Sequence, residues 1–275
     1  MKSIIYCLLA LVLTMCTAPQ EKIKIYMIGD STMANKPLEN DNQERGWGQV
    51  LPEFFNRNVT VDNHAKNGRS SKSFIDEGRW QVVLDSLKAG DYLIIQFGHN
   101  DEKADTARHT APGSTFDANL EKFVVEARAK GAIPVLMNSI VRRNFSDNPN
   151  AVANDDYRKA KADDPKVETD TLFDTHGDYR IAPKNVAQKL NVPFVDMNSL
   201  THELVQRLGK DESKSIYMWI SPGICAACPD GRQDNTHLNI YGAHVVAGIA
   251  VEAMAKEVPA LASYVVKPDI ESLKK

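Results

Sequence analysis

The sequence predicts an α/β domain with a central, mostly parallel β-sheet of about five strands. Three observations predict this fold. The first two are that five short apolar runs have the composition of strands and that amphipathic helical patterns separate them. The third observation is that these runs are largely apolar throughout, which is typical of strands covered on both faces. Strands joined by helices form right-handed βαβ units, so we expect the strands to lie parallel.

The first three strand candidates each end at a turn-forming residue. Residues 23–28 end at Gly29, residues 59–61 end at Asp62, and residues 92–97 form a nearly continuous apolar run that ends at Gly98. The fourth and fifth candidates cover residues 133–137 and 192–195.

Six helical patterns connect and follow these strands. Residues 47–56 are amphipathic, residues 79–88 place Val82, Val83 and Leu87 on one face, and residues 116–130 end at Gly131, a typical helix stop. The remaining patterns cover residues 179–190, 199–208 and 240–256. The least regular segments are 144–178 and 209–233, and long irregular segments of compact domains are often binding loops.

Composition excludes several classes of protein. The chain has 275 residues, of which 43% are hydrophobic and 25% charged, and these fractions are ordinary for a soluble globular domain. Collagen-like, disordered and multispanning membrane proteins are therefore excluded. The formal charge of −3 lacks the basic surplus of a nucleic-acid binder, so no nucleic-acid partner is expected.

The N-terminus has the pattern of a secretory signal peptide. Lys2 precedes an apolar run over residues 4–13, which is too short to span a bilayer. Residues 13–16 resemble a lipoprotein cleavage site with Cys16 as the lipidated residue, although Met15 stands where a small residue is expected. We therefore expect a signal peptide over residues 1–18, a single domain over residues 22–275, and a periplasmic or extracellular protein. Lipid anchoring at Cys16 and free release both stay open, and the alternative is an apolar N-terminal strand.

Cys225 and Cys228 are separated by two residues in a segment rich in proline and glycine. Such a pair could form a disulfide, bind a metal or act in redox chemistry. A zinc site needs about four ligands, and the sequence contains no second pair of this kind. A local disulfide or two free thiols are therefore favoured, and no chemistry is assigned to the pair.

Polar turns follow the first three strands of the predicted sheet. Residues 29–32 read Gly-Asp-Ser-Thr, residues 67–70 read Asn-Gly-Arg-Ser, and residues 98–101 read Gly-His-Asn-Asp. The carboxyl ends of parallel strands lie at one edge of the sheet, where ligands bind. Residues 234–237, Asp-Asn-Thr-His, directly precede the last helix.

These turns contain the residue types that serine hydrolysis needs. A serine hydroxyl is a weak nucleophile without an adjacent base, and His237 could be the base for Ser31. Asp234 lies three positions earlier, so one tight turn could place its carboxylate against the His237 ring. The backbone N–H groups of Ser31 and Gly68 and the Asn100 amide could stabilise an oxyanion. Alone, each motif is a turn, a helix cap or a surface histidine; together, in this order, they indicate a catalytic set.

The four blocks resemble those of the SGNH (GDSL-type) hydrolase superfamily. Residues 46–48, 67–74, 97–101 and 234–237 also resemble the rhamnogalacturonan acetylesterases, carbohydrate esterase family 12, which remove acetyl esters from pectin. The likeness covers roughly residues 22 to 256. It implies a three-layer αβα sandwich, with Ser31 as nucleophile, His237 as base, Asp234 as its orienting partner, and Ser31, Gly68 and Asn100 as the oxyanion hole. It implies no metal and no organic cofactor.

The resemblance thus predicts an exported serine esterase that deacetylates plant cell-wall polysaccharide, rhamnogalacturonan above all. The alternatives are an esterase for acetylated xylan or lipid acyl esters, and a non-catalytic glycan-binding protein of the same fold. Segments 101–113 and 211–233 are mostly polar, which favours a small acyl group over a lipid chain.

Candidate substrate contacts come from the aromatic and basic residues near these blocks. Tyr217 and Trp219 could stack on sugar rings, and the alternative for both is core packing. Arg69, Arg142 and Arg143 could pair with uronate carboxylates, and their alternative is surface ion pairing. Tyr217 and Trp219 lie in residues 217–233, which depart from the wider family, so contacts there cannot be transferred from it.

Overall fold

A five-stranded parallel sheet forms the centre of the molecule. The computed structural model describes residues 20–146 and 169–274, so the expected signal peptide and Cys16 lie outside the described residues. The strand order is β2-β1-β3-β4-β5, and every adjacent pair is parallel. The strands are β1 (Ile23–Gly29), β2 (Val59–Asn63), β3 (Tyr92–Gln96), β4 (Ile133–Met137) and β5 (Phe194–Val195). The predicted parallel sheet of five strands is therefore confirmed.

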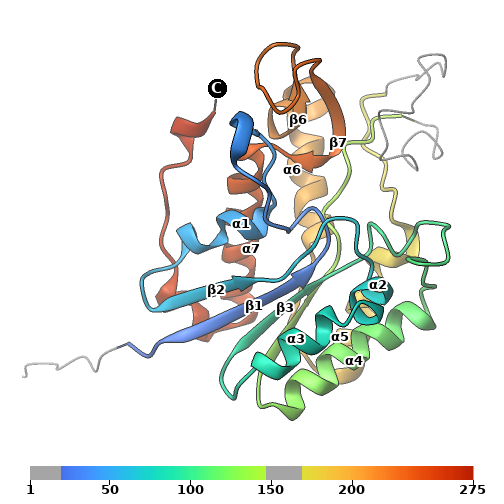
Figure 1. Ribbon diagram of the computed structural model, residues 1–275, viewed down its shortest axis with the longest axis vertical. Coiled ribbons are helices and arrows are strands. Elements are labelled where there is room, and N and C mark those ends of the chain that lie inside the picture. Colours follow the sequence, from blue (N-terminus) through green and yellow to red (C-terminus); the bar gives the residue numbers. More distant parts are fainter. Residues whose placement is uncertain (1–19, 147–168, 275) are drawn as a thin grey trace, which may run out of the picture.

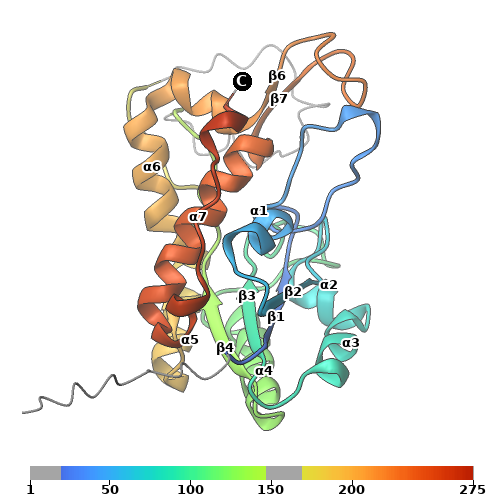
Figure 2. The same cartoon turned by 90° about the vertical axis from the view of Figure 1, so that its left-hand side faces the viewer.

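Helices cover both faces of this sheet, as Figures 1 and 2 show. One face carries α1 (Trp47–Val50), α6 (Met197–Glu212) and α7 (Ile240–Glu257). The other face carries α2 (Ser71–Asp76), α3 (Arg79–Ser86), α4 (Thr115–Ala129) and α5 (Ala182–Leu190). The three-layer αβα sandwich implied by the resemblance is confirmed. Short 3₁₀ helices complete the described chain: Glu39–Asp41, Leu51–Phe54, Gly177–Arg180, Ser213–Ile216, Pro259–Tyr264 and Glu271–Leu273.

The two hydrophobic cores follow from the two-residue period of the strands. Along β1, Ile25 and Met27 pack into the core shared with α1 and α7, whereas Tyr26 and Ile28 pack into the core shared with α3 and α4. Both faces of the central strands are consequently apolar. This double burial explains why their sequences read as continuous hydrophobic runs.

Proline shortens two of the predicted helices, and glycine interrupts a third. The pattern over residues 47–56 divides into α1 and a 3₁₀ helix that begins at Leu51, because Pro52 has no N–H to donate. The pattern over residues 179–190 becomes a 3₁₀ turn followed by α5, with Pro183 in the first turn of that helix. In α6, Gly209 has a positive φ of 69°, which ends the regular helix.

The structure contains elements that the sequence patterns missed. Residues 209–233 are not wholly irregular, because β6 (Tyr217–Ile220) and β7 (Arg232–Leu238) form an antiparallel pair. The loop between them carries a Cys225–Cys228 disulfide, so the favoured interpretation of this pair is confirmed. Helix α2 was missed because it is short and serine-rich; Ser70 and Ser73 form a capping box that fixes its start. No helix among the described residues is long and apolar enough to span a membrane.

Candidate active site

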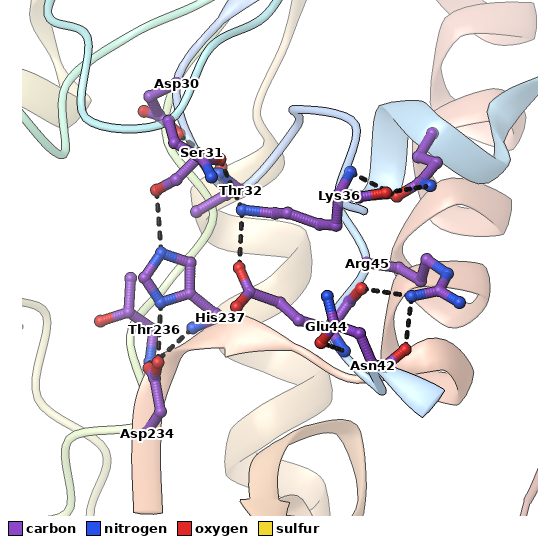
Figure 3. Close-up of polar contacts among 12 residues, drawn as sticks. Asp30, Ser31, Thr32, Lys36, Asn42, Glu44, Arg45, Asp234, Thr236 and His237 are labelled. Carbon is purple, nitrogen blue, oxygen red and sulfur yellow. Dashed lines mark hydrogen bonds and ion pairs between the residues drawn. The ribbon is translucent and has the colours of Figure 1, made fainter. Parts of the chain in front are cut away.

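A row of hydrogen bonds joins Ser31, His237 and Asp234 across the carboxyl edge of the sheet (Figure 3). The Ser31 Oγ atom lies 2.9 Å from His237 Nε2, and His237 Nδ1 lies 2.8 Å from Asp234 Oδ2. An ionised carboxylate only accepts hydrogen bonds, so Nδ1 carries the ring proton and Nε2 presents its lone pair to the hydroxyl. This arrangement suits proton transfer from a serine hydroxyl to an imidazole.

A bulge in β7 brings Asp234 and His237 together. Tyr217 pairs with Leu238 while its neighbour Met218 pairs with Asp234, so residues 235–237 loop out of the ladder. Inside this bulge, the Thr236 and His237 backbone N–H groups both donate to Asp234 Oδ1, at 2.8 and 2.9 Å. The expected tight turn is therefore present, within an element that the polar sequence of residues 232–238 did not suggest.

The Asp234 carboxyl group is held in its ionised form. Burial alone would raise its pKa, but the charge and hydrogen bond of His237 and the charge of Arg232 outweigh burial. The pKa of Asp234 therefore lies well below its ordinary value.

The turn that carries Ser31 is fixed by Asp30. Its Oδ1 atom accepts from the Thr32 N–H at 2.9 Å and from the Thr32 hydroxyl at 2.8 Å. Gln96 donates to the same hydroxyl and accepts from the buried Trp47 indole. Asp30 thus pins the turn by hydrogen bonding, and Trp47 belongs to the core.

Two backbone N–H groups are available near Ser31. Within the described residues, the N–H groups of Ser31 and Gly68 donate to no other group of the chain. Gly68 has a φ of +74°, a conformation that favours glycine. Asn100 is 6% exposed and donates from Nδ2 to the Arg69 carbonyl at 3.2 Å, which ties it to the Gly68 turn. Its Oδ1 accepts from Arg108 at 3.2 Å, so the amide nitrogen is kept on the opposite side.

Asp101 is a positioning residue that sequence reasoning missed. Its buried carboxyl group accepts from the Ser71 N–H at 3.0 Å and from the Thr110 hydroxyl at 2.9 Å, and the Ser71 hydroxyl contacts it as well. These contacts join the turn after β3 to the start of α2. Burial raises the pKa of Asp101 to about 7 against the pull of these donors. In the sequence, the only signal for this role of Asp101 is its position next to Asn100.

Charged side chains form a partly buried network behind the Asp234–His237 pair. Lys36 Nζ lies 2.6 Å from Glu44 Oε1, and Glu44 Oε2 lies 2.5 Å from an Arg232 nitrogen (the Lys36–Glu44 contact is drawn in Figure 3). Arg232 in turn pairs with Asp234 Oδ2. Burial alone would raise the pKa of Glu44, but the charges of His237, Lys36 and Arg232 lower it to about 2. Nothing in the spacing of these residues predicts the network.

This network should make stability depend on pH at the acidic end. The pKa of Glu44 falls from 4.5 to about 2 on folding, so its stabilisation is complete above pH 4.5 and is lost as pH falls toward 2. We expect Glu44→Gln to lower the free energy of unfolding by about 3 kcal/mol at neutral pH. Urea unfolding at a series of pH values measures this difference, which should vanish near pH 2. Glu39→Gln removes an exposed carboxylate of the same segment and is the control; an equal loss at every pH would contradict the prediction.

The two predicted sugar contacts, Tyr217 and Trp219, differ in their burial. The assignment of Tyr217 was wrong: it is 1% exposed and its hydroxyl donates to the Val141 carbonyl at 2.8 Å, so its ring is core. Trp219 is half-buried, and the Arg143 guanidinium carbon and Lys214 Nζ lie 4.9 and 5.0 Å from its ring. Its indole donates to Asn235 Oδ1 at 2.9 Å, which places it beside the β7 bulge.

The three arginines are all engaged with the protein. Arg69 is half-exposed and pairs with Glu77 at 3.0 Å, so a role in binding carboxylates stays a prediction. Arg142 and Arg143 were expected either at the substrate or in surface ion pairs. Both are buried, so surface ion pairing was wrong, and contact with the substrate stays a prediction. Arg142 is buried against Glu102, and Arg143 is buried with Asn235 among its acceptors. Long side chains with several donors can be buried when most of these donors reach acceptors, a fact that sequence composition does not reveal.

A pocket of about 460 Å³ lies near the turn that carries Asn100. Its lining includes Glu102, Lys103, Arg142, His176 and Tyr179. Among residues 20–146 and 169–274, no group of three or more histidine, cysteine or acidic side chains is placed to hold a metal ion.

Comparison with known proteins identifies relatives along most of the chain. Residues 27–242 match the model of the GDSL-like lipase/acylhydrolase family. The chain is 38% identical over 235 residues to the rhamnogalacturonan acetylesterase RhgT of Bacillus subtilis, covering 86% of this chain and 90% of that one. It is 28% identical to the rhamnogalacturonan acetylesterase of Emericella nidulans over 267 residues, covering 90% and 91% of the two chains.

A solved structure agrees with this assignment at the level of the fold. The crystal structure of the Bacillus subtilis protein YxiM superimposes with a TM-score of 0.64 at 23% identity, over 86% of this chain and 57% of that one. The family model spans well over half of the sequence, and the fold is that of the structural neighbour. The chain therefore belongs to the GDSL-like lipase/acylhydrolase family of carboxylic ester hydrolases.

Proposed function

We propose that this protein removes O-acetyl groups from plant cell-wall polysaccharide, rhamnogalacturonan above all, through an acyl-enzyme on Ser31. The observation that carries the proposal is the hydrogen-bonded row of Ser31, His237 and Asp234. It occurs in a chain that is 38% identical to a protein named rhamnogalacturonan acetylesterase. Ordered donors around an activated hydroxyl are what acyl transfer requires.

The reaction proceeds in two steps. Ser31 Oγ attacks the acetyl carbonyl carbon while His237 Nε2 takes the hydroxyl proton; the tetrahedral intermediate then collapses, the ester C–O bond breaks, and His237 returns the proton to the departing sugar oxygen. Water then attacks the acetyl-Ser31 ester, gives its proton to His237, and acetate leaves as the proton returns to Ser31. Asp234 stays ionised and orients the ring throughout.

Ser31, Gly68 and Asn100 form the oxyanion hole in this proposal. The two backbone N–H groups and the second hydrogen of the Asn100 amide supply the donors for the negative oxygen of the intermediate. Asn100→Ala should lower kcat by about 10²- to 10³-fold, because one fixed donor is lost from the transition state. Steady-state hydrolysis of 4-nitrophenyl acetate measures the loss. The Asn185→Ala variant, at an exposed position on α5, is a control; an Asn100→Ala enzyme within a few-fold of wild type would remove Asn100 from the oxyanion hole.

The acyl group is small in this proposal. A lipid acyl chain needs a broad apolar pocket, whereas segments 101–113 and 211–233 are mostly polar in sequence. We expect kcat/KM to fall steeply from acetyl to butyryl and octanoyl 4-nitrophenyl esters. A preference for the longer chains would favour the lipid esterase instead.

The polysaccharide is identified by measuring acetate release. Acetylated rhamnogalacturonan and acetylated xylan are compared at equal acetate content, with the Ser31→Ala protein as the blank. Faster release from rhamnogalacturonan supports the proposal, and faster release from xylan transfers it to that polymer. Stoichiometric labelling of Ser31 by a fluorophosphonate separates an esterase from a glycan-binding protein that lacks activity.

We also propose that the protein is exported, since its polymeric substrate lies outside the cell. Support comes from the signal-like pattern of residues 1–18. Mass spectrometry of the protein expressed in a bacterial host distinguishes a free new N-terminus from a lipid-modified Cys16. A full-length chain that keeps Met1 would contradict export.

A further inference from the structure

We infer that Arg232 is a positioning residue for ester hydrolysis, and that Glu44 and Lys36 hold it in place. The inference rests on the proposed roles of Ser31, His237 and Asp234, and it adds to them a partly buried row of alternating charges. Arg232 stands two positions before Asp234 on β7, so both side chains project from the same face of that strand. Its guanidinium contacts Asp234 Oδ2, the same oxygen that accepts the hydrogen bond from His237 Nδ1.

The hydrogen bonds of the Asp234 carboxylate leave it no freedom to rotate. Oδ1 accepts from two backbone N–H groups of the β7 bulge, those of Thr236 and His237. Oδ2 accepts from His237 Nδ1 and from Arg232. A carboxylate offers about four acceptor positions, so Arg232 fills the last of them. Without Arg232, the oxygen that orients His237 would keep a single partner.

Arg232 is itself held by a second carboxylate. One terminal nitrogen lies 2.5 Å from Glu44 Oε2, while the other contacts Asp234 and lies 3.3 Å from His237 Nδ1. Planar guanidinium groups suit such a bridge because their donors point in fixed directions. Glu44 is a fixed partner, since the neighbouring Arg45 N–H donates to the Leu238 carbonyl at 3.0 Å, one residue beyond His237.

The row of charges extends to the turn that carries Gly68. Lys36 Nζ lies 2.6 Å from Glu44 and donates to the Asn67 side-chain oxygen at 2.7 Å. Asn67 directly precedes Gly68. Side-chain bonds from Gln49 to both backbone groups of Lys36 fix the lysine. Lys36, Glu44 and Arg232 therefore connect the two parts of the site that must keep one geometry, the base and the oxyanion donors.

The charges of this row balance in the resting protein. Two cations, Lys36 and Arg232, alternate with two carboxylates, Glu44 and Asp234, so each charge lies beside its opposite. Such pairs hold geometry well, because breaking one leaves a partly buried charge without a partner. The row therefore contributes more to the orientation of Asp234 than to substrate binding. Separate measurements of kcat and KM distinguish these two roles.

The test compares Arg232→Gln, Arg232→Lys and wild type on 4-nitrophenyl acetate at neutral pH. Removing one charged hydrogen bond from the carboxylate that orients the base should lower kcat about ten- to a hundredfold. KM should be unchanged, since Arg232 does not touch the substrate in this inference. Arg232→Lys keeps a cation and should recover part of kcat. The rate at which a fluorophosphonate labels Ser31 should fall in parallel, because it depends on the same base.

The control is Arg128→Gln on α4, whose guanidinium donates to the Leu190 and Asn191 carbonyls. Circular dichroism and thermal unfolding show whether each variant is folded. If Arg232→Gln does not fold, the Arg232→Lys protein carries the test. A double-mutant cycle with Glu44→Gln adds a second criterion: Glu44 acts through Arg232, so the double variant should lose little more kcat than Arg232→Gln alone.

Three outcomes would overturn the inference. The first is an Arg232→Gln enzyme with wild-type kcat, and the second is a raised KM at unchanged kcat, which would make Arg232 a substrate contact. The third is independent, multiplying losses in the double-mutant cycle. These results are distinguishable from failure of the proposed function, in which Ser31→Ala itself would keep its activity.

Discussion

Ser31→Ala should reduce kcat for acetyl ester hydrolysis by about 10⁶-fold. The variant removes the only oxygen that His237 Nε2 contacts among the described residues, so no acyl-enzyme can form. The remaining donors at Ser31, Gly68 and Asn100 still bind the ester and leave a residual rate above that in water. Substitution by alanine keeps the backbone N–H of residue 31, so the loss reports the hydroxyl alone.

The measurement is the initial rate on 4-nitrophenyl acetate, supported by acetate release from the polysaccharide. Ser86→Ala on α3 removes a hydroxyl that only bonds within its own helix and should keep full activity. A burst of nitrophenol in wild type, equal to the enzyme concentration and absent from Ser31→Ala, would identify the acyl-enzyme. An alanine variant that hydrolyses the ester at the wild-type rate would refute Ser31 as nucleophile.

Asp234→Asn should reduce kcat by about 10⁴-fold while the protein stays folded. Two backbone N–H groups donate to Oδ1, so the amide oxygen of the asparagine will occupy that position. The amide nitrogen must then face His237 Nδ1, and it can only donate. The imidazole is forced into the other tautomer, with a proton on Nε2, and it cannot accept the Ser31 proton.

Asp62→Asn provides a matched control for this variant. Asp62 also pairs with a histidine, His64, at 3.1 Å, but this pair lies at the end of β2 and contacts neither Ser31 nor His237. Its loss should leave kcat unchanged. Thermal unfolding of both variants separates a change of tautomer from a loss of structure. An Asp234→Asn enzyme with a kcat near wild type would show that His237 does not depend on Asp234.

The layered fold could be predicted because it depends on local patterns. Double burial makes β1, β3 and β4 continuous apolar runs, and amphipathic helices need no long-range information to be recognised. Elements stabilised by single side-chain contacts escaped prediction. Helix α2 begins at a serine capping box and at the Asp101 carboxylate, and β7 pairs with β6 although its sequence is polar.

The residues of the candidate site could be predicted from the sequence, whereas the side chains that pack around them were harder to predict. Ser31, Gly68 and Asn100 follow strands whose carboxyl ends must meet at one edge in a parallel sheet. Tyr217, by contrast, lies in a segment whose aromatic side chain suits a sugar site or a core equally well. Its burial depends on the approach of the Val141 carbonyl, which is remote in the sequence.

The sequence by itself determined the α/β class, the order of the elements and the residues at the strand ends, because hydrophobic period and turn chemistry act over a few neighbouring positions. Only the tertiary structure decided that Arg232 pairs with Glu44, 188 positions away. The same holds for the 206 positions between Ser31 and His237. Contacts of this kind depend on how the chain packs as a whole, and charge pairs leave no periodic signal in the sequence.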